Sequence, residues 1–259
     1  MIPQSYITAW QKEAPWQENF QVEQDLIIHR ALIALFSDEF LKERLAFRGG
    51  TALHKLYLAP AARYSEDIDL VQMKPEPFGS IINRMRETLS FLGKPIVKQK
   101  QHNNAIIYRI ISEDGVQIRL KIEVNTREHF SVFGIKESAV DLKSEWISGE
   151  AMVPTFELEE LLSTKLRALY QRKKGRDLFD LWYALTNHKV DIEKLITAFH
   201  HYMEEEGNTI TQKDYLENME KKIEDPDFIG DMNGLLRTGI EYDIKKAYEL
   251  VKTNLLEKI

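Results

Sequence analysis

The sequence predicts an α+β protein in which a mixed β-sheet flanked by helices is followed by a helical domain. Two observations support this prediction. Between residues 45 and 125, short runs with the two-residue period of strands alternate with runs of helical period. From Pro154 to the end, the pattern is helical throughout. We therefore expect an α/β domain over residues 1–153 and a helical domain over residues 154–259.

The composition excludes several classes of function. The chain has 259 residues and 43% hydrophobic content, which is enough for a real core. It has no cysteine, so disulfides, thiolate–zinc sites and cysteine nucleophiles are excluded. The formal net charge of -6 argues against a uniformly basic nucleic-acid coat but leaves a local basic patch open. Because no run could span a bilayer and the N-terminus has no signal pattern, we expect a cytoplasmic protein with no membrane partner.

The expected elements follow from the recurrence of apolar residues. Strands are expected over residues 45–47, 65–71, 96–101, 105–111 and 116–125. Helices of the first domain are expected over residues 22–40, 51–58 and 81–92, and Thr51 is placed to cap the second of them. Helices of the second domain are expected over residues 157–171, 177–185, 192–205, 211–223 and 240–256, and Asp225-Pro226 is expected to be a turn.

The most informative stretch is the strand over residues 65–71. Asp67 and Asp69 alternate with apolar residues there, so both carboxylates project from one face while Ile68 points to the other. Two such anions are stable side by side when a cation lies between them, and hard oxygen ligands suit magnesium. The alternative is a solvated edge strand or an acidic turn, which is the commoner explanation of an isolated Asp-x-Asp.

The residues just upstream favour a ligand site. Gly49-Gly50-Thr51 follows an apolar run, and adjacent glycines before a hydroxyl residue let backbone amides approach an anion at a helix N-terminus. A later strand adds a third carboxylate, because the apolar residues of 116–125 share one face and leave Glu123 on the other with Lys121. Strand phase is compatible with Glu123 as a metal ligand or as an exposed charge paired with a neighbouring cation.

The helix over 157–171 places Lys165 near the centre of a leucine stripe. An ammonium there needs a carboxylate or a ligand phosphate opposite it, unless its stem reaches solvent from the edge of the stripe. The basic turn 172–176 leads into a nearly all-apolar helix whose polar edge carries Asp177 and Asp180. Asp177 can cap the helix or offset its dipole, whereas Asp180 lies deeper and should need a cation such as Lys165.

Taken in order, three segments resemble the AbiEii/AbiGii nucleotidyltransferase toxin family of the DNA polymerase β-type nucleotidyltransferase superfamily. They are Phe47–Leu53, Arg63–Leu70 and Lys165–Leu181, and the resemblance runs from about residue 22 to 200. It implies a nucleotidyltransferase core followed by a helical domain, use of a nucleoside triphosphate with one or two Mg²⁺ ions, and a toxin role with a cognate antitoxin. Some relatives look like enzymes that add nucleotides to the acceptor end of tRNA, so RNA is the expected acceptor.

The resemblance also implies residue roles. Gly50 and Thr51 correspond to the Gly-Ser of the superfamily motif, although Thr51 replaces the commoner serine. The residues expected in catalysis are Asp67, Asp69, Glu123, Lys165 and Asp180, and the first three are also the expected metal ligands. The residues expected to bind the nucleotide are Gly49, Gly50, Thr51, Lys55, Ser65, Arg172, Arg176 and Asp177. We expect Lys165 and Asp180 to face the acidic pair across a cleft.

Three other classes of function compete with this one. A catalytically silent nucleotide-binding or antitoxin-binding module would bind without magnesium-dependent turnover. A small-molecule nucleotidyltransferase would need an acidic pocket for a polycation, and a phosphotransferase or kinase would transfer the γ-phosphate instead. The basic turn 172–176 favours an anionic acceptor such as RNA, unless it is a solvated turn.

Overall fold

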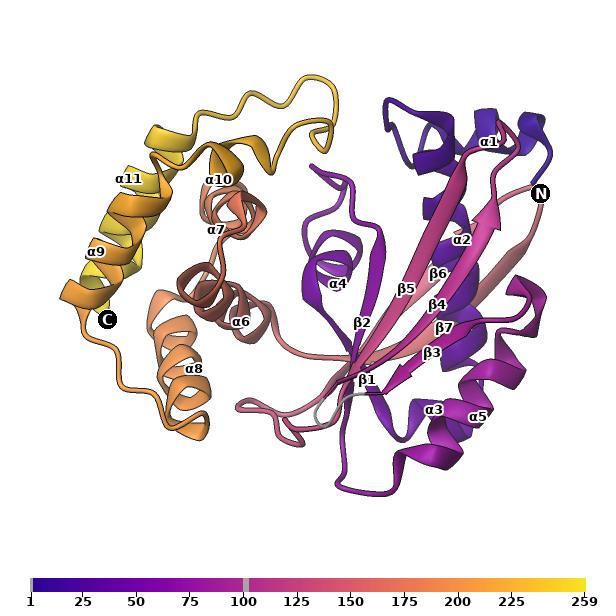
Figure 1. Cartoon of the computed structure of the whole chain (residues 1–259), viewed down its shortest axis with the longest axis horizontal. Coiled ribbons are helices and arrows are strands. Elements are labelled where there is room, and N and C mark those ends of the chain that lie inside the picture. The colour runs from indigo at the N-terminus through magenta and orange to yellow at the C-terminus, as the bar shows by residue number, and fades with distance from the viewer. Residues whose placement is uncertain (1, 100–102) are drawn as a thin grey trace. The chain divides into compact units, whose positions relative to one another are not determined.

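The computed structural model describes residues 2–99 and 103–259 (Figure 1). Residues 100 and 101, the end of the strand expected over 96–101, lie outside the described residues. The chain divides into two compact units, Met1–Phe156 and Glu157–Ile259. Within the described residues, no helix has the length and apolar character that crossing a membrane requires.

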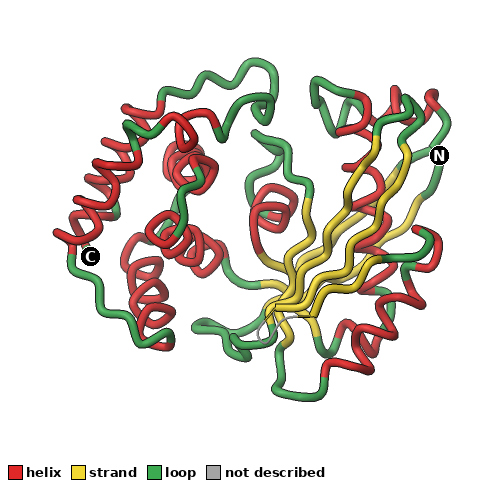
Figure 2. The backbone as a smooth tube through the Cα atoms, viewed as in Figure 1, coloured by secondary structure: helices red, strands yellow, loops and turns green. Residues whose placement is uncertain are grey.

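The first unit is built on a seven-stranded mixed sheet with the order β3-β4-β5-β2-β1-β7-β6. Figure 2 shows the strands of this sheet in yellow. Strand β2 runs parallel to β5 and β1 runs parallel to β7, whereas the other neighbouring pairs are antiparallel. The strands are β1 (Leu45–Arg48), β2 (Asp67–Gln72), β3 (Ile96–Gln99), β4 (Asn103–Ile111), β5 (Gln117–Asn125), β6 (Lys136–Lys143) and β7 (Ser148–Thr155).

Helices cover both faces of this sheet. They are α1 (Gln4–Trp10), α2 (Asn19–Phe36), α3 (Glu39–Lys42), α4 (Gly49–Leu56), α5 (Phe78–Thr88) and the 3₁₀ turn η1 (Ser90–Leu92). The long helix α2 packs against β5, β6 and β7, while α4 packs against β1 and β2. Figure 1 shows α4 and α2 on opposite sides of the sheet.

Strand alternation decides which side chains enter the core under α2. The four apolar residues of β5 that share a face are all buried: Ile118, Leu120, Ile122 and Val124. In the register of the sheet, Leu70 of β2 lies opposite Phe47 of β1 and beside Val124, so the same apolar face continues across three strands. The polar residues of β2 and β5 therefore gather on the other face, which is the face of α4.

No strand or helix is predicted from the sequence over residues 126–153, and the structure corrects this omission. They contain most of a hairpin in which β6 and β7 pair from Lys136–Thr155 to Lys143–Ser148. The hairpin was missed because β6 lies at the sheet edge and buries only Val140 and Leu142, so its sequence lacks a strong apolar period. The hydroxyl of Thr155 donates to the carbonyl of Phe47 at 2.8 Å, which ties β7 to β1.

The second unit is helical. Its elements are α6 (Leu158–Gln171), α7 (Gly175–Asn187), α8 (Ile192–Glu205), α9 (Gln212–Lys222), α10 (Pro226–Gly230), α11 (Ile244–Asn254) and the 3₁₀ turn η2 (Leu256–Lys258). Helix α6 packs against α7 and α8, and α7 packs against α11. Asp225-Pro226 is not a simple turn, because Asp225 caps α10 and Pro226 is the first residue of that helix.

Candidate functional site

The acidic strand is the centre of the candidate site. Asp67 and Asp69 project from the α4 side of β2, and the parallel register places Lys121 beside Asp67 and Glu123 beside Asp69. Ile68 between them is fully buried on the other face. The tertiary structure thus brings to one place three carboxylates that lie up to 56 positions apart in the sequence, from Asp67 to Glu123.

A lysine lies among these carboxylates. The ammonium Nζ of Lys121 is 2.5 Å from Oε2 of Glu123 and 3.4 Å from Oδ2 of Asp67. Burial disfavours the charge on Lys121, but the hydrogen bond to Glu123 and the negative charge of Asp67 outweigh it and raise the pKa of this lysine. Asn103 also donates to Glu123. In the free protein, Lys121 therefore supplies the positive charge that the acidic face needs.

The carboxylate of Asp67 is only partly stabilised by its neighbours in the free protein. Burial raises its pKa, and the attraction of Lys121 offsets only part of that effect. Its Oδ1 is buried and has no hydrogen-bond partner in the described part of the chain. An unpartnered buried carboxylate oxygen is costly, so this atom is suited to a cation.

The three carboxylates can bind a magnesium ion only after Lys121 has moved. Among residues 2–99 and 103–259, no three acidic or imidazole side chains lie close enough together to form a metal site as they stand. Lys121 occupies the space between Asp67 and Glu123, and oxygen ligands must converge on a metal at about 2.1 Å. The donor set therefore fits magnesium when Lys121 has moved away.

Gly49 brings the start of α4 against Asp69. Its backbone has a φ of +81°, and a Cβ at this position would lie 2.2 Å from Oδ2 of Asp69. No residue with a side chain fits there without moving the carboxylate. The close approach of backbone to an anion that the glycine pair predicts is thus present, and in the free protein the anion is the carboxylate of Asp69.

Replacing Gly49 by alanine is expected to lower the thermal stability of the first unit and the activity together. The positive φ costs about 1–3 kcal/mol for a side-chain residue, and the clash with Asp69 adds to this cost. Gly93→Ala is a matched control, because Gly93 has a φ of +85° but nothing within 4 Å of a Cβ. Equal stability losses in the two variants would show that contact with Asp69 is unimportant.

Thr51 does not cap α4, contrary to the prediction. The helix begins at Gly49, and Thr51 lies inside its first turn. The Thr51 hydroxyl donates to the carbonyl of Asp67 and lies 2.8 Å from the hydroxyl of Ser65. Because a hydroxyl has one proton to donate, Ser65 is the donor in the second bond. The two predicted phosphate-binding hydroxyls thus link α4 to the start of the acidic strand.

Lys55, which the sequence assigns to nucleotide binding, makes its bonds on the other helix. Its ammonium lies 2.7 Å from Oδ1 of Asp25 and 3.1 Å from Nδ1 of His29, both on α2. Burial would raise the pKa of Asp25, but Lys55 and His29 together outweigh burial and hold that pKa well below its usual range. Trp10 donates to the same carboxylate at 3.0 Å. Lys55 therefore joins α4 to α2 and is not brought to the acidic pair.

Two further charged residues near the site were not singled out from the sequence. Arg48, the register partner of Asp69, forms an ion pair with Glu128. The side chain of Asn125 holds Glu128 in place by accepting from its backbone N–H at 2.9 Å. The position of Arg48 directly before the glycine pair was the available signal, whereas the loop position of Glu128 gave none.

In the second unit, a buried charge cluster joins α6 to α7. Nζ of Lys165 lies 3.1 Å from Oδ1 of Asp177 and 2.9 Å from Oδ2 of Asp180. Arg172 binds both oxygens of Asp177, at 2.7 and 2.8 Å. This confirms that Lys165 has carboxylate partners and that Asp180 has a cation. The capping interpretation of Asp177 is wrong, because the helix begins at Gly175 with no side-chain cap and Asp177 is engaged in ion pairs.

The pH dependence of stability in this unit follows from Asp177. Burial would raise its pKa, but Lys165 and Arg172 outweigh burial and lower the pKa. A carboxyl whose folded pKa is depressed contributes stability above its unfolded pKa of about 4 and loses it as the pH falls through the folded value. We expect urea unfolding between pH 6 and pH 2 to show this loss as a slope that Asp177→Asn reduces and that the exposed Asp227→Asn leaves unchanged.

The basic turn 172–176 is neutralised within its own unit. Beyond the bond of Arg172 to Asp177, Lys173 lies 2.7 Å from Asp225, and Lys174 lies 3.1 Å from Asp231. Arg176 contacts the same Asp231 with its side chain at 3.6 Å. Because each of these cations contacts an aspartate, the turn is not a patch of free positive charge, which weakens the expectation that it binds RNA phosphates.

Solved structures share this architecture. The fold resembles that of MenT4, a nucleotidyltransferase toxin of Mycobacterium tuberculosis H37Rv, with a TM-score of 0.68 and 17% identity over 98% of this chain and 90% of that one. It also resembles a putative nucleotidyltransferase from H. pylori, with a TM-score of 0.53 and 20% identity over 93% and 96% of the two chains. The fold of this chain is thus one that solved nucleotidyltransferase structures share.

The sequence narrows this class to one family. Residues 30–250 match the family described as "Nucleotidyl transferase AbiEii toxin, Type IV TA system". The chain belongs to this AbiEii family of toxin nucleotidyltransferases, as its three segments predict. No curated protein matches it in sequence.

Proposed function

We propose that the protein is a magnesium-dependent toxin that transfers a nucleoside monophosphate from a nucleoside triphosphate to RNA, at the 3′ end of a tRNA, in the cytoplasm. A cognate antitoxin would oppose it in a toxin–antitoxin or abortive-infection system. The observation that carries the proposal is the convergence of Asp67, Asp69 and Glu123 on one face of the sheet, with the start of α4 against Asp69. Membership of the AbiEii family supports nucleotidyl transfer and a toxin role.

The residues of the first unit divide the work of this reaction. Asp67, Asp69 and Glu123 would hold one or two Mg²⁺ ions, which supply positive charge for the triphosphate and the attacking hydroxyl when bound. The backbone of Gly49 and Gly50 would bind the phosphate tail. The acceptor oxygen forms a bond to the α-phosphorus, the bond from that phosphorus to the leaving pyrophosphate breaks, and the hydroxyl proton passes to a site carboxylate such as Glu123 or to water.

The hydroxyls of Thr51 and Ser65 and the displaced Lys121 complete this assignment. The hydroxyl pair lies at the first residue of the acidic strand, and one of its hydroxyls would have to release its present acceptor before it could donate to a phosphate oxygen. Lys121 must leave Asp67 and Glu123 before oxygen ligands converge, and its ammonium is then available to a phosphate. The same flexible side chain would thus balance charge in both states of the site.

The charged residues of the second unit would act in the reaction only after exchanging their present partners. The sequence assigns Lys165 to charge that develops on the phosphates, and in that role it would have to exchange Asp177 or Asp180 for a phosphate. The buried cluster fixes the corner between α6 and α7 that carries Arg172 and Arg176. Nucleotide binding by either arginine would likewise need release from Asp177 or Asp231.

The test is a labelling experiment with the full chain. The protein is incubated with total RNA, magnesium and each nucleoside triphosphate in turn, labelled at the α- or the γ-phosphate. We expect one or more α-labelled triphosphates to label RNA of tRNA size, and EDTA to abolish the labelling. Labelling from the γ-phosphate alone would indicate a phosphotransferase, and no labelling of RNA with any nucleotide would favour a binding module or a small-molecule acceptor.

Replacing Lys121 by methionine is expected to strengthen magnesium binding and slow transfer. The variant removes the ammonium that competes for Asp67 and Glu123, so the half-saturating Mg²⁺ concentration should fall by about tenfold, as for loss of one close charge pair. Isothermal titration with Mg²⁺ measures this directly. Lys98→Met, on the exposed edge strand β3, is the control. An unchanged or weaker affinity in Lys121→Met would contradict the displacement.

A further inference from the structure

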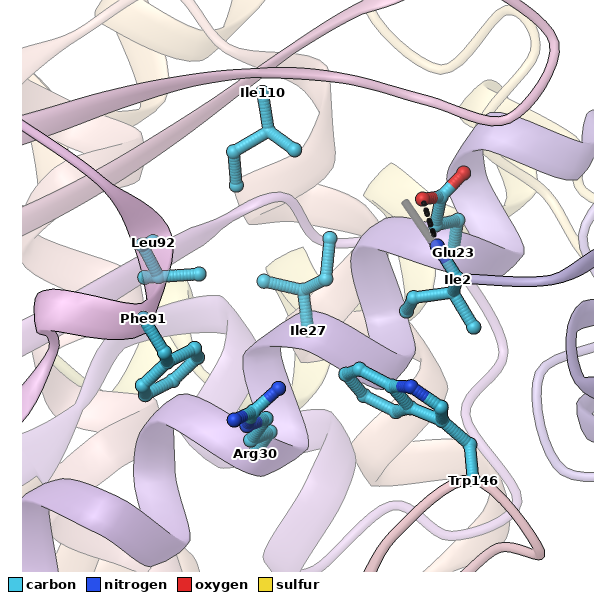
Figure 3. Close-up of a pocket in the computed structure, with 8 residues that line it drawn as sticks. All are labelled: Ile2, Glu23, Ile27, Arg30, Phe91, Leu92, Ile110 and Trp146. Carbon is cyan, nitrogen blue, oxygen red and sulfur yellow. Dashed lines mark hydrogen bonds between the residues drawn. The ribbon is translucent and has the colours of Figure 1, made fainter.

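Two adjoining cavities lie in the first unit, and the proposed reaction uses neither. They measure about 120 and 190 Å³ and share the side chains of Arg30 and Phe91. Arg30 belongs to α2, which covers the apolar face of the sheet, whereas the acidic pair projects from the other face. The smaller cavity is also lined by Ile2, Glu23, Ile27, Leu92, Ile110 and Trp146 (Figure 3).

The guanidinium of Arg30 is held between two aromatic rings. Its Cζ lies 3.9 Å from the ring centroid of Phe91 and 5.0 Å from that of Trp146. Figure 3 shows the guanidinium between the two rings, and all three side chains line the smaller cavity. Stacking of this kind uses the faces of the planar group and leaves the N–H donors at its edge for an acceptor.

Those donors have no acceptor in the described part of the chain, in which no carboxylate or carbonyl binds Arg30. The side chain of Arg30 is partly buried, and this burial lowers its pKa. Two other stacked arginines are neutralised. Arg44 lies 3.9 Å from the ring of Phe40 but binds Glu76 at 3.1 Å, and Arg167 lies over an aromatic ring and binds a glutamate at 3.0 Å. Arg30 is therefore a half-buried cation without its counter-charge.

Glu23, at the other end of the smaller cavity, is not the missing partner. Its Oε2 accepts from the backbone N–H of Glu113 at 2.9 Å, and its Oε1 from that of Ile2 at 3.4 Å. Figure 3 shows it beyond Ile27 from Arg30. A ligand must therefore place its negative charge at Arg30 and an apolar part against the aliphatic walls, because the Glu23 end would repel an anion.

We propose that these cavities bind a small organic anion, a carboxylate or a phosphate monoester carried on an apolar body the size of a single ring. The volume sets the size, because a cavity of about 150 Å³ accommodates benzene. The free guanidinium edge sets the charge, because a two-oxygen anion can accept two parallel N–H bonds from it. This ligand site is separate from the nucleotidyl-transfer site and does not depend on the function proposed for it.

Four small probes test the proposal by nuclear magnetic resonance on the full chain. They are benzoate, phenyl phosphate, the neutral benzamide, and acetate, which has the charge without the ring. We expect benzoate or phenyl phosphate to shift the indole N–H signal of Trp146 and to bind at least about tenfold more tightly than benzamide, because a charge-assisted bond is lost in the amide. Acetate should bind more weakly than benzoate. Whether benzoate or phenyl phosphate binds more tightly then shows whether the ligand is a carboxylate or a phosphate.

Substitutions at Arg30 then test whether the probes bind in these cavities. Arg30→Met keeps an unbranched stem between the rings, and it should remove the preference of the cavity for benzoate or phenyl phosphate over benzamide. Arg44→Met, which loses a stacked but neutralised arginine, should leave that preference intact. If Arg30→Met does not fold, Arg30→Lys keeps the charge without the planar edge and should weaken the anions while keeping their preference. Equal affinities for benzoate and benzamide in the native protein, or no shift of Trp146 with any probe, would overturn the proposal.

Discussion

Asparagine in place of Asp67 or Asp69 is expected to reduce the transfer of α-labelled nucleotide to RNA by at least about a hundredfold, as for loss of one preorganised charge-stabilising group. Each change removes a negative charge that would hold magnesium and preserves the size of the side chain. Initial rates of RNA labelling at saturating nucleotide measure the loss.

The same substitution at Asp67 is expected to leave the fold intact or make it more stable. Burial raises the pKa of Asp67, and its Oδ1 has no hydrogen-bond partner in the described residues, so the charged carboxylate is disfavoured in the folded free protein. Thermal unfolding should therefore separate activity from stability. Asp141→Asn, at an exposed aspartate of β6, is the control and should retain full transfer. Full transfer by Asp67→Asn would refute the metal assignment.

Methionine in place of Lys165 is expected to destabilise the second unit by about 3–5 kcal/mol, the cost of breaking a buried ion pair by removal of one partner. Asp177 and Asp180 have no exposed side-chain surface, and Lys165 contacts both of them. Removal of the ammonium leaves two buried carboxylates with one cation fewer. Urea unfolding followed by the fluorescence of Trp182, which lies on α7, measures the change.

Two variants test whether the loss comes from the buried charge. Lys173→Met breaks an ion pair with Asp225 at the surface, where both partners are well solvated, and no measurable loss is expected. The double variant Lys165→Met with Asp180→Asn removes one cation and one anion together, so it should be less destabilised than the sum of the two single variants. A loss in Lys165→Met no larger than that in Lys173→Met would contradict the role of the cluster.

Local sequence patterns predicted the structure correctly where a type of residue can be accommodated in only one kind of environment. The alternation in 116–125 placed the buried and the polar faces of β5 correctly, because a strand with one buried face must alternate. Lys165 in its leucine stripe predicted a buried ion pair, because an ammonium cannot be desolvated alone. The hairpin of β6 and β7 gave no such pattern, because the edge strand β6 buries few side chains and the place of β7 in the sheet depends on distant residues of β1.

The sequence by itself determined the α+β class, the acidic pair on one face of a strand, the glycine-led helix before it and the AbiEii family of the chain. The tertiary structure alone decided which charges meet. It placed Lys121 between Asp67 and Glu123, Lys55 on Asp25, and aspartates against the basic turn. The physical reason is that periodicity fixes the face on which a side chain lies, whereas an ion pair depends on the register and packing of segments far apart in the chain.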